Sequence, residues 1–282
     1  MRLGISPFAS TREGVIRISE AAVDGGLDTL WLGDGYVAGD DFPGWAGGME
    51  SMTELAWLSG RFPSARVGVS AAVLPLRDPQ WLAKEANTLD NLTSGGFVLV
   101  VTPGFWPRDF SHRGVDFDDR GTLFDERLGA LVAALDGSSF DGVHTHVPAW
   151  GRLAPEPDTG GGVPVWLAGA TATMRRALRL GMPYQASRAT PDDLAPIAAE
   201  WFDNGGTVLA HRVRVQAGDV DATGNEVDWQ AITGSADQLV DALERFRELG
   251  VSDLSMVPGQ HERASLDTIE VLAVDVLPQL AG

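Results

Sequence analysis

Residues 97–101 read FVLVV, and this run of five apolar residues decides the fold class. A strand with one face in water alternates apolar and polar residues, whereas FVLVV is apolar on both faces. Strands of this kind belong to parallel sheets that are covered on both sides. We therefore predict a sheet in which this strand lies deep in the molecule.

Short apolar runs and amphipathic stretches alternate on both sides of this strand. This βα rhythm is typical of a parallel sheet. Strands are expected at Leu3–Ser6, Thr29–Gly33, Arg66–Val73, Phe97–Val101, Pro164–Leu167, Gln185–Arg188, Thr207–Val215 and Asp253–Val257. Helices are expected at Gly14–Asp24, Ser51–Ser59, Pro79–Leu92, Leu123–Leu135, Ala172–Leu180, Asp192–Asn204, Ala236–Leu249 and Leu266–Leu280.

The number of βα units favours a closed (β/α)8 TIM barrel over an open doubly wound sheet. A phosphate-binding G-x-G-x-x-G after the first strand, which a Rossmann domain would carry, is missing. We predict an α/β protein with one barrel domain over residues 1–282. Residues 137–162 contain Gly, Pro, His and Asp with little periodicity, and we expect an insertion loop there.

Composition limits the classes of partner and site. The 282 residues include 39 acidic and 21 basic side chains, so the formal net charge is −18. Phosphate backbones and anionic membrane surfaces would repel such a chain, and we expect neither nucleic acid nor a membrane as partner. The absence of cysteine excludes disulfides and thiolate metal ligands. With no signal-like N-terminus and no long apolar run, a soluble cytoplasmic protein is expected.

Barrel enzymes carry their chemistry on the loops that follow the strands. Asp34 follows the second predicted strand between two glycines, and it is our candidate for a polar catalytic contact. The alternative is an Asp that only caps the turn. Ser70 and Ala71 interrupt the third strand with small side chains, which leaves room for a flat ligand or for close helix packing.

Aromatic residues follow the fourth strand, where loops normally carry small polar residues. Thr102 and Gly104 end this strand, and Phe105 and Trp106 come next. Their rings suit a planar or apolar ligand, and we group them with Phe8, after the first strand, as a substrate pocket. The alternative is that the rings pack on neighbouring loops or on a partner subunit.

A possible anion site follows the fifth strand. Gly169, Ala170 and Thr171 lead directly into a helix, whose free N–H groups and dipole could bind the phosphate of a cofactor. An ordinary Thr N-cap would give the same pattern. The five histidines show no metal-binding spacing, and we predict no metal site.

Four stretches resemble the luciferase-like monooxygenase family, which includes bacterial luciferase and deazaflavin-dependent oxidoreductases. They occur in the family's order and cover nearly the whole chain. They are LPLRDPQWLAKEANTLDNLTSGGF (74–97), VVTPGFWPRDFSHRGVDFDDRGTLFDE (100–126), VPVWLAGATATMRRALRLGMPY (163–184) and ITGSADQLVDALERFRELGVSDLSMVP (232–258).

This resemblance implies a barrel that binds FMN or the deazaflavin coenzyme F420 at its C-terminal mouth. It also implies a non-prolyl cis peptide near Ser70–Ala71, behind the flavin ring. The cofactor-binding residues carried over are Asp34, Ser70, Ala71, Thr102, Gly104, Gly169, Ala170 and Thr171. The chain departs from the family where a frequent His is replaced by Gly35 and where Gly-Val-Gly is replaced by Val100-Val101-Thr102.

The resemblance favours an oxidoreductase that acts on a small organic molecule. With F420 it would transfer a hydride, and with FMN it would activate oxygen and need a flavin reductase as partner. Related barrels often dimerise, so a homodimer is expected. A non-catalytic flavin-binding or interaction protein is the alternative, motivated by Gly35. A barrel hydrolase or lyase has least support, because the acidic residues are scattered.

Overall fold

A closed ring of parallel strands forms the centre of the molecule. The computed structural model describes residues 1–9, 11–36, 48–149, 153–158, 160–218, 231–259 and 261–280. Its barrel strands are β1 (Arg2–Ile5), β2 (Thr29–Leu32), β3 (Arg66–Val73), β4 (Phe97–Thr102), β7 (Val165–Ala168), β8 (Tyr184–Ser187), β9 (Leu209–Ala217) and β11 (Val251–Pro258). The order β9-β11-β1-β2-β3-β4-β7-β8 closes through pairing of β8 with β9. The predicted (β/α)8 barrel is confirmed.

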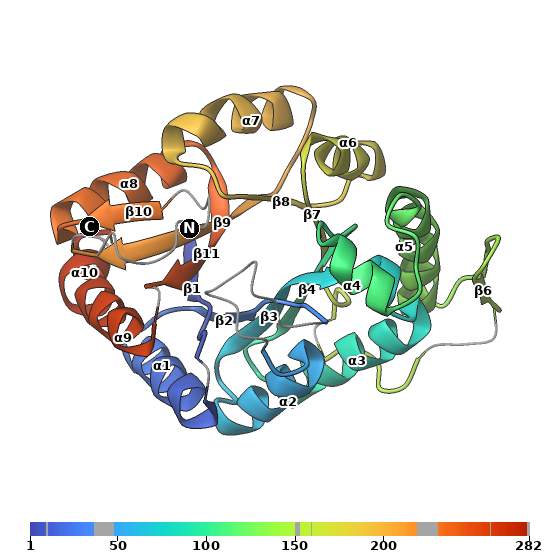
Figure 1. Cartoon of the computed structure of the whole chain (residues 1–282), viewed down its shortest axis with the longest axis horizontal. Coiled ribbons are helices and arrows are strands. Elements are labelled where there is room, and N and C mark those ends of the chain that lie inside the picture. Colours follow the sequence, from blue (N-terminus) through green and yellow to red (C-terminus); the bar gives the residue numbers. More distant parts are fainter. Residues whose placement is uncertain are drawn as a thin grey trace.

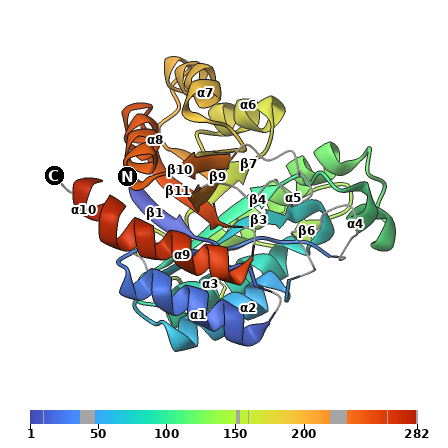
Figure 2. The ribbon, with the colours of Figure 1, turned by 60° about the vertical axis from the view of Figure 1, so that its left-hand side comes forward.

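Helices surround this ring on its outer side (Figure 1). Figure 2 shows the last long helix beside the first, so the two ends of the chain meet on one flank. The helices are α1 (Arg12–Asp24), α2 (Ser51–Arg61), α3 (Pro79–Leu92), α4 (Pro107–His112), α5 (Arg120–Asp136), α6 (Thr171–Leu180), α7 (Pro191–Asp203), α8 (Ala236–Glu248), α9 (Glu262–Val271) and α10 (Leu277–Leu280), with a 3-10 turn η1 (Leu74–Leu76) and a π segment η2 (Leu272–Val276).

Local capping signals set several helix starts. Asp78 accepts hydrogen bonds from the N–H groups of Gln80 and Trp81, directly before Pro79 at the first helical position of α3. Ser235 and Gln238 form a complete capping box at α8. The last helix was expected from Leu266 and begins four residues earlier.

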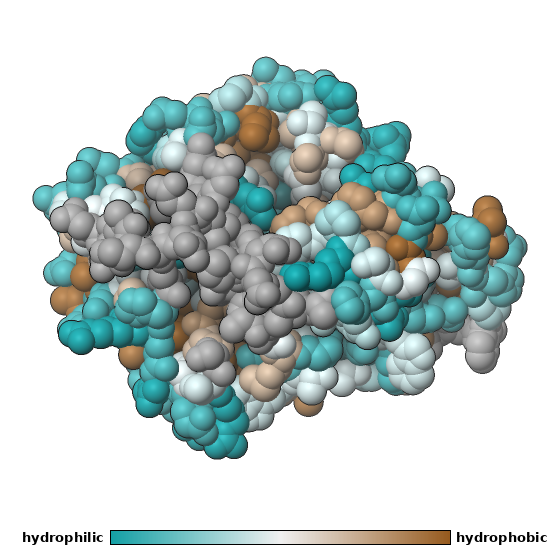
Figure 3. Space-filling model, in the orientation of Figure 1, coloured by the Kyte–Doolittle hydropathy of each residue, from teal (hydrophilic) through white to brown (hydrophobic). Residues whose placement is uncertain are grey.

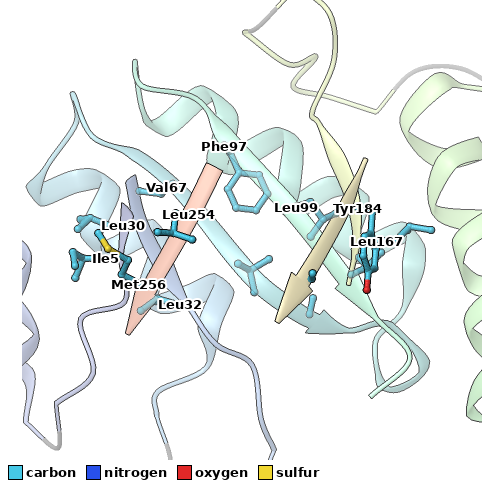
Figure 4. Close-up of a cluster of buried hydrophobic side chains, with 14 of the residues drawn as sticks. Ile5, Leu30, Leu32, Val67, Phe97, Leu99, Leu167, Tyr184, Leu254 and Met256 are labelled. Carbon is cyan, nitrogen blue, oxygen red and sulfur yellow. The ribbon is translucent and has the colours of Figure 1, made fainter. Parts of the chain in front are cut away.

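The outer core fills the space between the strands and the helices. Alternate residues of a strand belong to it, as Leu30 and Leu32 of β2 and Leu254 and Met256 of β11 do (Figure 4). Their alternation matches the period of a strand. These side chains are almost completely buried, so each removes its apolar surface from water and stabilises the barrel.

A second, smaller cluster fills the inside of the barrel. Trp31 and Trp166 pack there with ring centroids 6.0 Å apart, together with Val98, Val100, Ala168 and Ala210. The Trp31 ring lies where side chains of Gly4 and Gly68 would otherwise stand, since a Cβ at either glycine would overlap the indole. The two strands that flank β2 therefore have glycine at this level, because the interior accommodates the large ring of Trp31.

Three short strands lie outside the barrel ring. Strand β10 (Ala231–Gly234) pairs with β9 outside the ring and was not expected. The predicted insertion contains a short antiparallel pair, β5 (Phe140–Asp141) with β6 (His146–Val147), which contacts α5 at the periphery (Figure 1). Both lie away from the inner cluster.

The surface agrees with the acidic composition. Figure 3 shows mostly hydrophilic residues on the face in view, with hydrophobic residues scattered among them. Among the described helices, none combines the length and the apolar composition that crossing a membrane requires.

Candidate functional site

The third strand changes its register at the two small residues that the sequence singled out. Val69 pairs with Leu99, but Ala72 pairs with Val101, so β3 contains one extra residue at this point. The peptide between Ser70 and Ala71 is cis. The expected non-prolyl cis peptide is therefore confirmed at the expected position. Ala71 lies against the inner cluster, so the bulge faces the barrel interior.

A hydrogen bond crosses the barrel from this bulge. The hydroxyl of Ser70 donates to Oε1 of Gln185 on β8 at 2.6 Å. Strands β3 and β8 are separated by two others in the ring, so the two side chains meet in the interior. Gln185 is buried, and its Nε2 has no partner among the described residues.

Ser6 presents a similar unpaired group. Its residue follows β1, and its buried hydroxyl has no hydrogen bond within the described part of the chain. A buried polar group without a partner costs about 1–3 kcal/mol. The unused donor of Gln185 and the hydroxyl of Ser6 are groups that a polar heterocycle in the mouth could satisfy.

The loop after β4 brings its aromatic residues to the mouth. The Gly104 N–H donates to Oγ1 of Thr102 at 3.3 Å, and Gly104 has a φ of +84°. A Cβ at Gly104 would approach Val73 to 2.8 Å, so a larger residue would disturb the end of β3. The turn thus fixes where the next residues, Phe105 and Trp106, begin.

Phe105 and Trp106 pack on each other rather than in the core. Their ring centroids are 5.2 Å apart, and Phe105 is 57% exposed. The guanidinium carbon of Arg188, after β8, lies 4.8 Å from the centroid of the Phe105 ring. Arg188 has a φ of +64°, a conformation that few non-glycine residues adopt.

Phe8 lies beside a second arginine at the mouth. The guanidinium carbon of Arg212 is 5.7 Å from the centroid of the Phe8 ring, and its Nη1 donates to Oγ of Ser255 at 3.1 Å. Burial and the nearby charge of Arg188 lower the pKa of Arg212 to about 10. Arg212 therefore remains a cation at neutral pH, within a protein of net charge −18.

The predicted anion site lies at the start of α6. Gly169 follows β7 with a φ of +152°, and a Cβ there would approach Oγ1 of Thr173 to 2.6 Å. Ala170 is the N-cap and supplies no side-chain acceptor, so the first N–H groups of the helix lack a cap. Ala170 and Thr171 are exposed, which leaves these N–H groups open to an anion.

Asp34 is held by neighbouring groups. Its two oxygens accept hydrogen bonds from Nε and Nη2 of Arg77 at 2.9 and 2.7 Å, and one accepts from the N–H of Val73 at 3.0 Å. The hydroxyl of Ser51 donates to it at 3.1 Å. Asp34 thus ties the end of β2 to the end of β3 and the start of α2.

Glu50 completes this network. It accepts a hydrogen bond from Arg77 Nη2 at 2.6 Å and caps α2. Burial raises the pKa of Glu50, but the hydrogen bonds from Arg77 and Thr53 outweigh it, and the pKa falls to about 2. Burial likewise opposes the charge of Arg77, yet its bonds to Asp34 and Glu50 raise its pKa.

Two cavities flank the end of β2. The larger, about 430 Å³, is lined by Asp34, Arg77 and the exposed rings of Tyr36 and Trp81. The smaller, about 180 Å³, is lined by Phe8, Gly33 and Glu54 among others. Glu54 is a buried carboxyl group that the sequence did not single out.

One buried histidine faces away from the barrel interior. His211 points outward from β9 onto Phe246, and burial lowers its pKa to about 4 despite hydrogen bonds to backbone oxygens. It is neutral and structural at physiological pH. Across the described residues, no group of His, Asp or Glu could hold a metal ion.

Most of the sequence-predicted residues converge on the C-terminal mouth. Ser70 and Ala71 lie within β3, Thr102 ends β4, and Gly104 and Gly169 follow β4 and β7, three neighbouring strands of the ring. Phe8, Phe105 and Trp106 lie at its rim. Asp34 stands slightly outside, in the network with Arg77. Their roles toward a ligand stay predictions. Strand alternation could have placed Gln185 and Arg212 inside the barrel, but their partners come from distant parts of the chain.

Known proteins provide an independent comparison. The family model of luciferase-like monooxygenases matches residues 6–207, well over half of the chain. A curated relative, 4-hydroxyprotoasukamycin monooxygenase of Streptomyces nodosus subsp. asukaensis, is 28% identical over 247 residues, which are 79% of this chain and 60% of the relative. The first three curated relatives are matched over 37–60% of their own length.

Solved structures share the whole fold. Monooxygenase RslO1 of Streptomyces bottropensis matches with a TM-score of 0.80 at 18% identity, over 99% of this chain and 100% of its own. The oxygenating constituent of 3,6-diketocamphane monooxygenase from Pseudomonas putida, in complex with FMN, has a TM-score of 0.77 at 14% identity, over 99% and 98% of the two chains. An F420-dependent secondary alcohol dehydrogenase has a TM-score of 0.79 at 13% identity, over 98% of each chain.

Proposed function

The chain belongs to the luciferase-like monooxygenase family, and on that premise we propose that it is an oxidoreductase that uses F420 or FMN. The coenzyme ring would lie in the mouth of the barrel, against the Ser70–Ala71 bulge. The substrate is proposed to be a small organic molecule. The proteins of similar fold include both an FMN complex and an F420-dependent enzyme, which supports either coenzyme.

The observation that carries this proposal is the buried amide of Gln185. Its Oε1 is used by Ser70, whereas its Nε2 has no partner among the described residues. A flavin or deazaflavin ring has carbonyl and ring-nitrogen acceptors along its pyrimidine edge. One of these acceptors would satisfy the Nε2 donor, which otherwise stays desolvated. The residues present therefore fit such a ring.

The phosphate of the coenzyme would bind at the start of α6. Gly169 allows the backbone to turn into the helix, and the uncapped N–H groups near Thr171 favour an anion. When bound, F420 supplies hydride transfer, and reduced FMN supplies activation of oxygen. The protein's part is to bind the ring, to orient it and to exclude water.

The rim residues would receive the substrate. Phe8, Phe105 and Trp106 offer apolar surfaces, which suit a planar or apolar molecule. Arg188 and Arg212 lie over two of these rings and bring two cationic groups to the rim. Negative charge that develops on a ligand between them would be stabilised.

The partners follow from the coenzyme. An FMN-dependent enzyme would need a flavin reductase to supply reduced FMN, whereas an F420-dependent enzyme would exchange a hydride with its substrate directly. We also propose a homodimer. Sedimentation of the purified protein tests this last point, with a monomer as the contrary result.

A fluorescence titration with F420 and, separately, with FMN tests the proposal. Tight binding of F420 alone would direct the search to hydride donors and acceptors. Tight binding of FMN alone would direct it to oxygen-dependent turnover with a reductase. Binding of neither would remove the proposal.

A non-catalytic coenzyme-binding protein is the second candidate. It is favoured by Gly35, which stands where the family often has a histidine, and by the outward position of His211. Tight coenzyme binding without turnover across a panel of donors and acceptors would favour it. Any coenzyme-dependent turnover would exclude it.

A further inference from the structure

The smaller cavity has a buried acid in its wall. Glu54 lies on the inward face of α2, on the same side as Leu55 and Leu58, and its residue is 8% exposed. The cavity of about 180 Å³ lies at the ends of β1 and β2, where Phe8 and Leu32 form part of its apolar lining. A buried acid on the inward face of a helix is unusual unless it has a partner.

Within the described residues, Glu54 has no such partner. No hydrogen bond and no ion pair joins its carboxyl group to any group in the described part of the chain. A buried carboxylate without a partner loses hydration and gains nothing in return. Glu54 nevertheless lines the cavity, so a ligand there could supply the missing contact.

The surrounding charges do not neutralise Glu54. Burial, together with the charge of Glu50 on the same helix, raises its pKa to about 7. Arg12, on α1, also lines the cavity, but its guanidinium group pairs with Glu13 at 2.7 Å. Arg17 of α1 pairs with Glu262 of α9. At the strand ends, Arg77 pairs with both Asp34 and Glu50. Arg212 lies over the Phe8 ring at 5.7 Å from its centroid, but its hydrogen bond goes to Ser255. Among the described residues, no cation therefore pairs with Glu54.

We propose that this cavity binds the ammonium group of an amine substrate, with Glu54 as its counter-ion. The inference deepens the proposed function, on which it rests, because it names the chemical class of the substrate. An alkylammonium ion combines a positive charge with an apolar body, and the cavity combines one carboxyl group with apolar walls. An anion would be repelled by the carboxylate of Glu54, and a neutral alcohol would leave the charge of Glu54 unpaired.

The expected signature is a dependence of amine binding on pH. The fraction of ionised Glu54 rises from about a tenth at pH 6 to about nine tenths at pH 8, so affinity should rise about tenfold. A simple alkylamine stays protonated over this range. Binding at pH 7 should release about half a proton, since the ligand stabilises the ionised carboxylate.

Isothermal titration of the full chain with n-butylamine at pH 6, 7 and 8 tests the inference, with n-butanol and butyrate as matched ligands. Glu54→Gln keeps the shape of the side chain and should abolish the rise with pH, with at least a tenfold weaker affinity at pH 8. Glu85→Gln is the matched control, because Glu85 is a half-buried acid that lines the larger cavity. It should bind n-butylamine as the wild type does.

Each result decides the matter. Equal binding of n-butylamine and n-butanol, wild-type binding by Glu54→Gln, or loss of binding in Glu85→Gln alone would overturn the inference. Should Glu54→Gln fail to fold, the proton release of the wild type, measured in two buffers of different ionisation enthalpy, decides alone. A coenzyme titration separates the two claims: amine binding without coenzyme binding removes the proposed function, and the reverse removes only this inference.

Discussion

Asp34 accepts two hydrogen bonds from Arg77: Nε lies 2.9 Å from one carboxylate oxygen and Nη2 lies 2.7 Å from the other. The side chains are 9% and 18% exposed, so water screens the pair little. Two parallel hydrogen bonds between a guanidinium and a carboxylate also fix their orientation. The pair joins the ends of β2 and β3 beside the mouth.

Asp34→Asn should therefore destabilise the fold by about 3 kcal/mol, because it leaves the buried charge of Arg77 without its main partner. Urea unfolding measures this loss. Glu20→Gln, which removes the exposed partner of Arg61, is the control and should cost less than about 1 kcal/mol. If Asp34→Asn leaves stability, coenzyme affinity and turnover unchanged, neither a clamping nor a catalytic role holds.

Glu54→Gln should stabilise the protein at alkaline pH. The pKa of Glu54 is raised from 4.5 to about 7 in the folded state. The folded wild type therefore holds this proton more tightly than the unfolded chain does. Its contribution to the free energy of unfolding is fully present below pH 4.5 and is lost as the pH rises through 7. At pH 8 the variant should exceed the wild type by about 2–3 kcal/mol, and at pH 4 the two should agree. A pH-independent difference in urea unfolding would contradict this.

Gly68→Ala should destabilise the barrel, because the new Cβ would overlap the Trp31 ring inside it. Overpacking of a filled core costs about 1–3 kcal/mol. Gly60→Ala is the matched control, since a Cβ at this helical position meets nothing within 4 Å and should stabilise the protein by about 0.5–1 kcal/mol. Equal unfolding midpoints for the two variants would disprove the packing account of Trp31.

Gly169→Ala should weaken binding of the coenzyme phosphate. The added Cβ would meet Thr173 and strain a backbone with a φ of +152°. Affinity for FMN should fall about tenfold, while affinity for riboflavin, which lacks the phosphate, should stay the same. If the coenzyme is F420, its affinity is compared in the same way with that of its phosphate-free fragment. Gly161→Ala, with open space around the Cβ, is the control. Equal losses for both ligands would locate the phosphate elsewhere.

The sequence predicts the elements of this fold well where the signals are local. Helix α3 begins and ends at the expected residues, Pro79 and Leu92, because Asp78 and Pro79 act on the adjacent turn. Strand β3 also has the expected bounds. The last helix begins earlier than its apolar pattern indicates, since the His261 ring accepts the capping hydrogen bond from Ala264. The short helix α4 and strand β10 carried too few periodic residues to be predicted.

The candidate site was predictable only in part. Strand ends and the family resemblance pointed to Ser70 and Gly169, because glycine and small residues leave a local trace. Strand alternation could have placed Gln185 inside the barrel, but its contact with Ser70, 115 positions away, left no trace in the sequence. Glu54 resembles an ordinary solvated residue in the sequence, and only the packing of α2 against the strands buries it.

The most direct test of the central claim is a fluorescence titration of the wild type and of Gln185→Leu with F420 and FMN. We expect the wild type to bind one of them. Gln185→Leu should bind that coenzyme at least tenfold more weakly, because the Nε2 donor is lost. Gln279→Leu, which changes an exposed amide on the last helix, should bind as the wild type does. Failure of the wild type to bind either coenzyme, or unchanged binding by Gln185→Leu, would contradict the account.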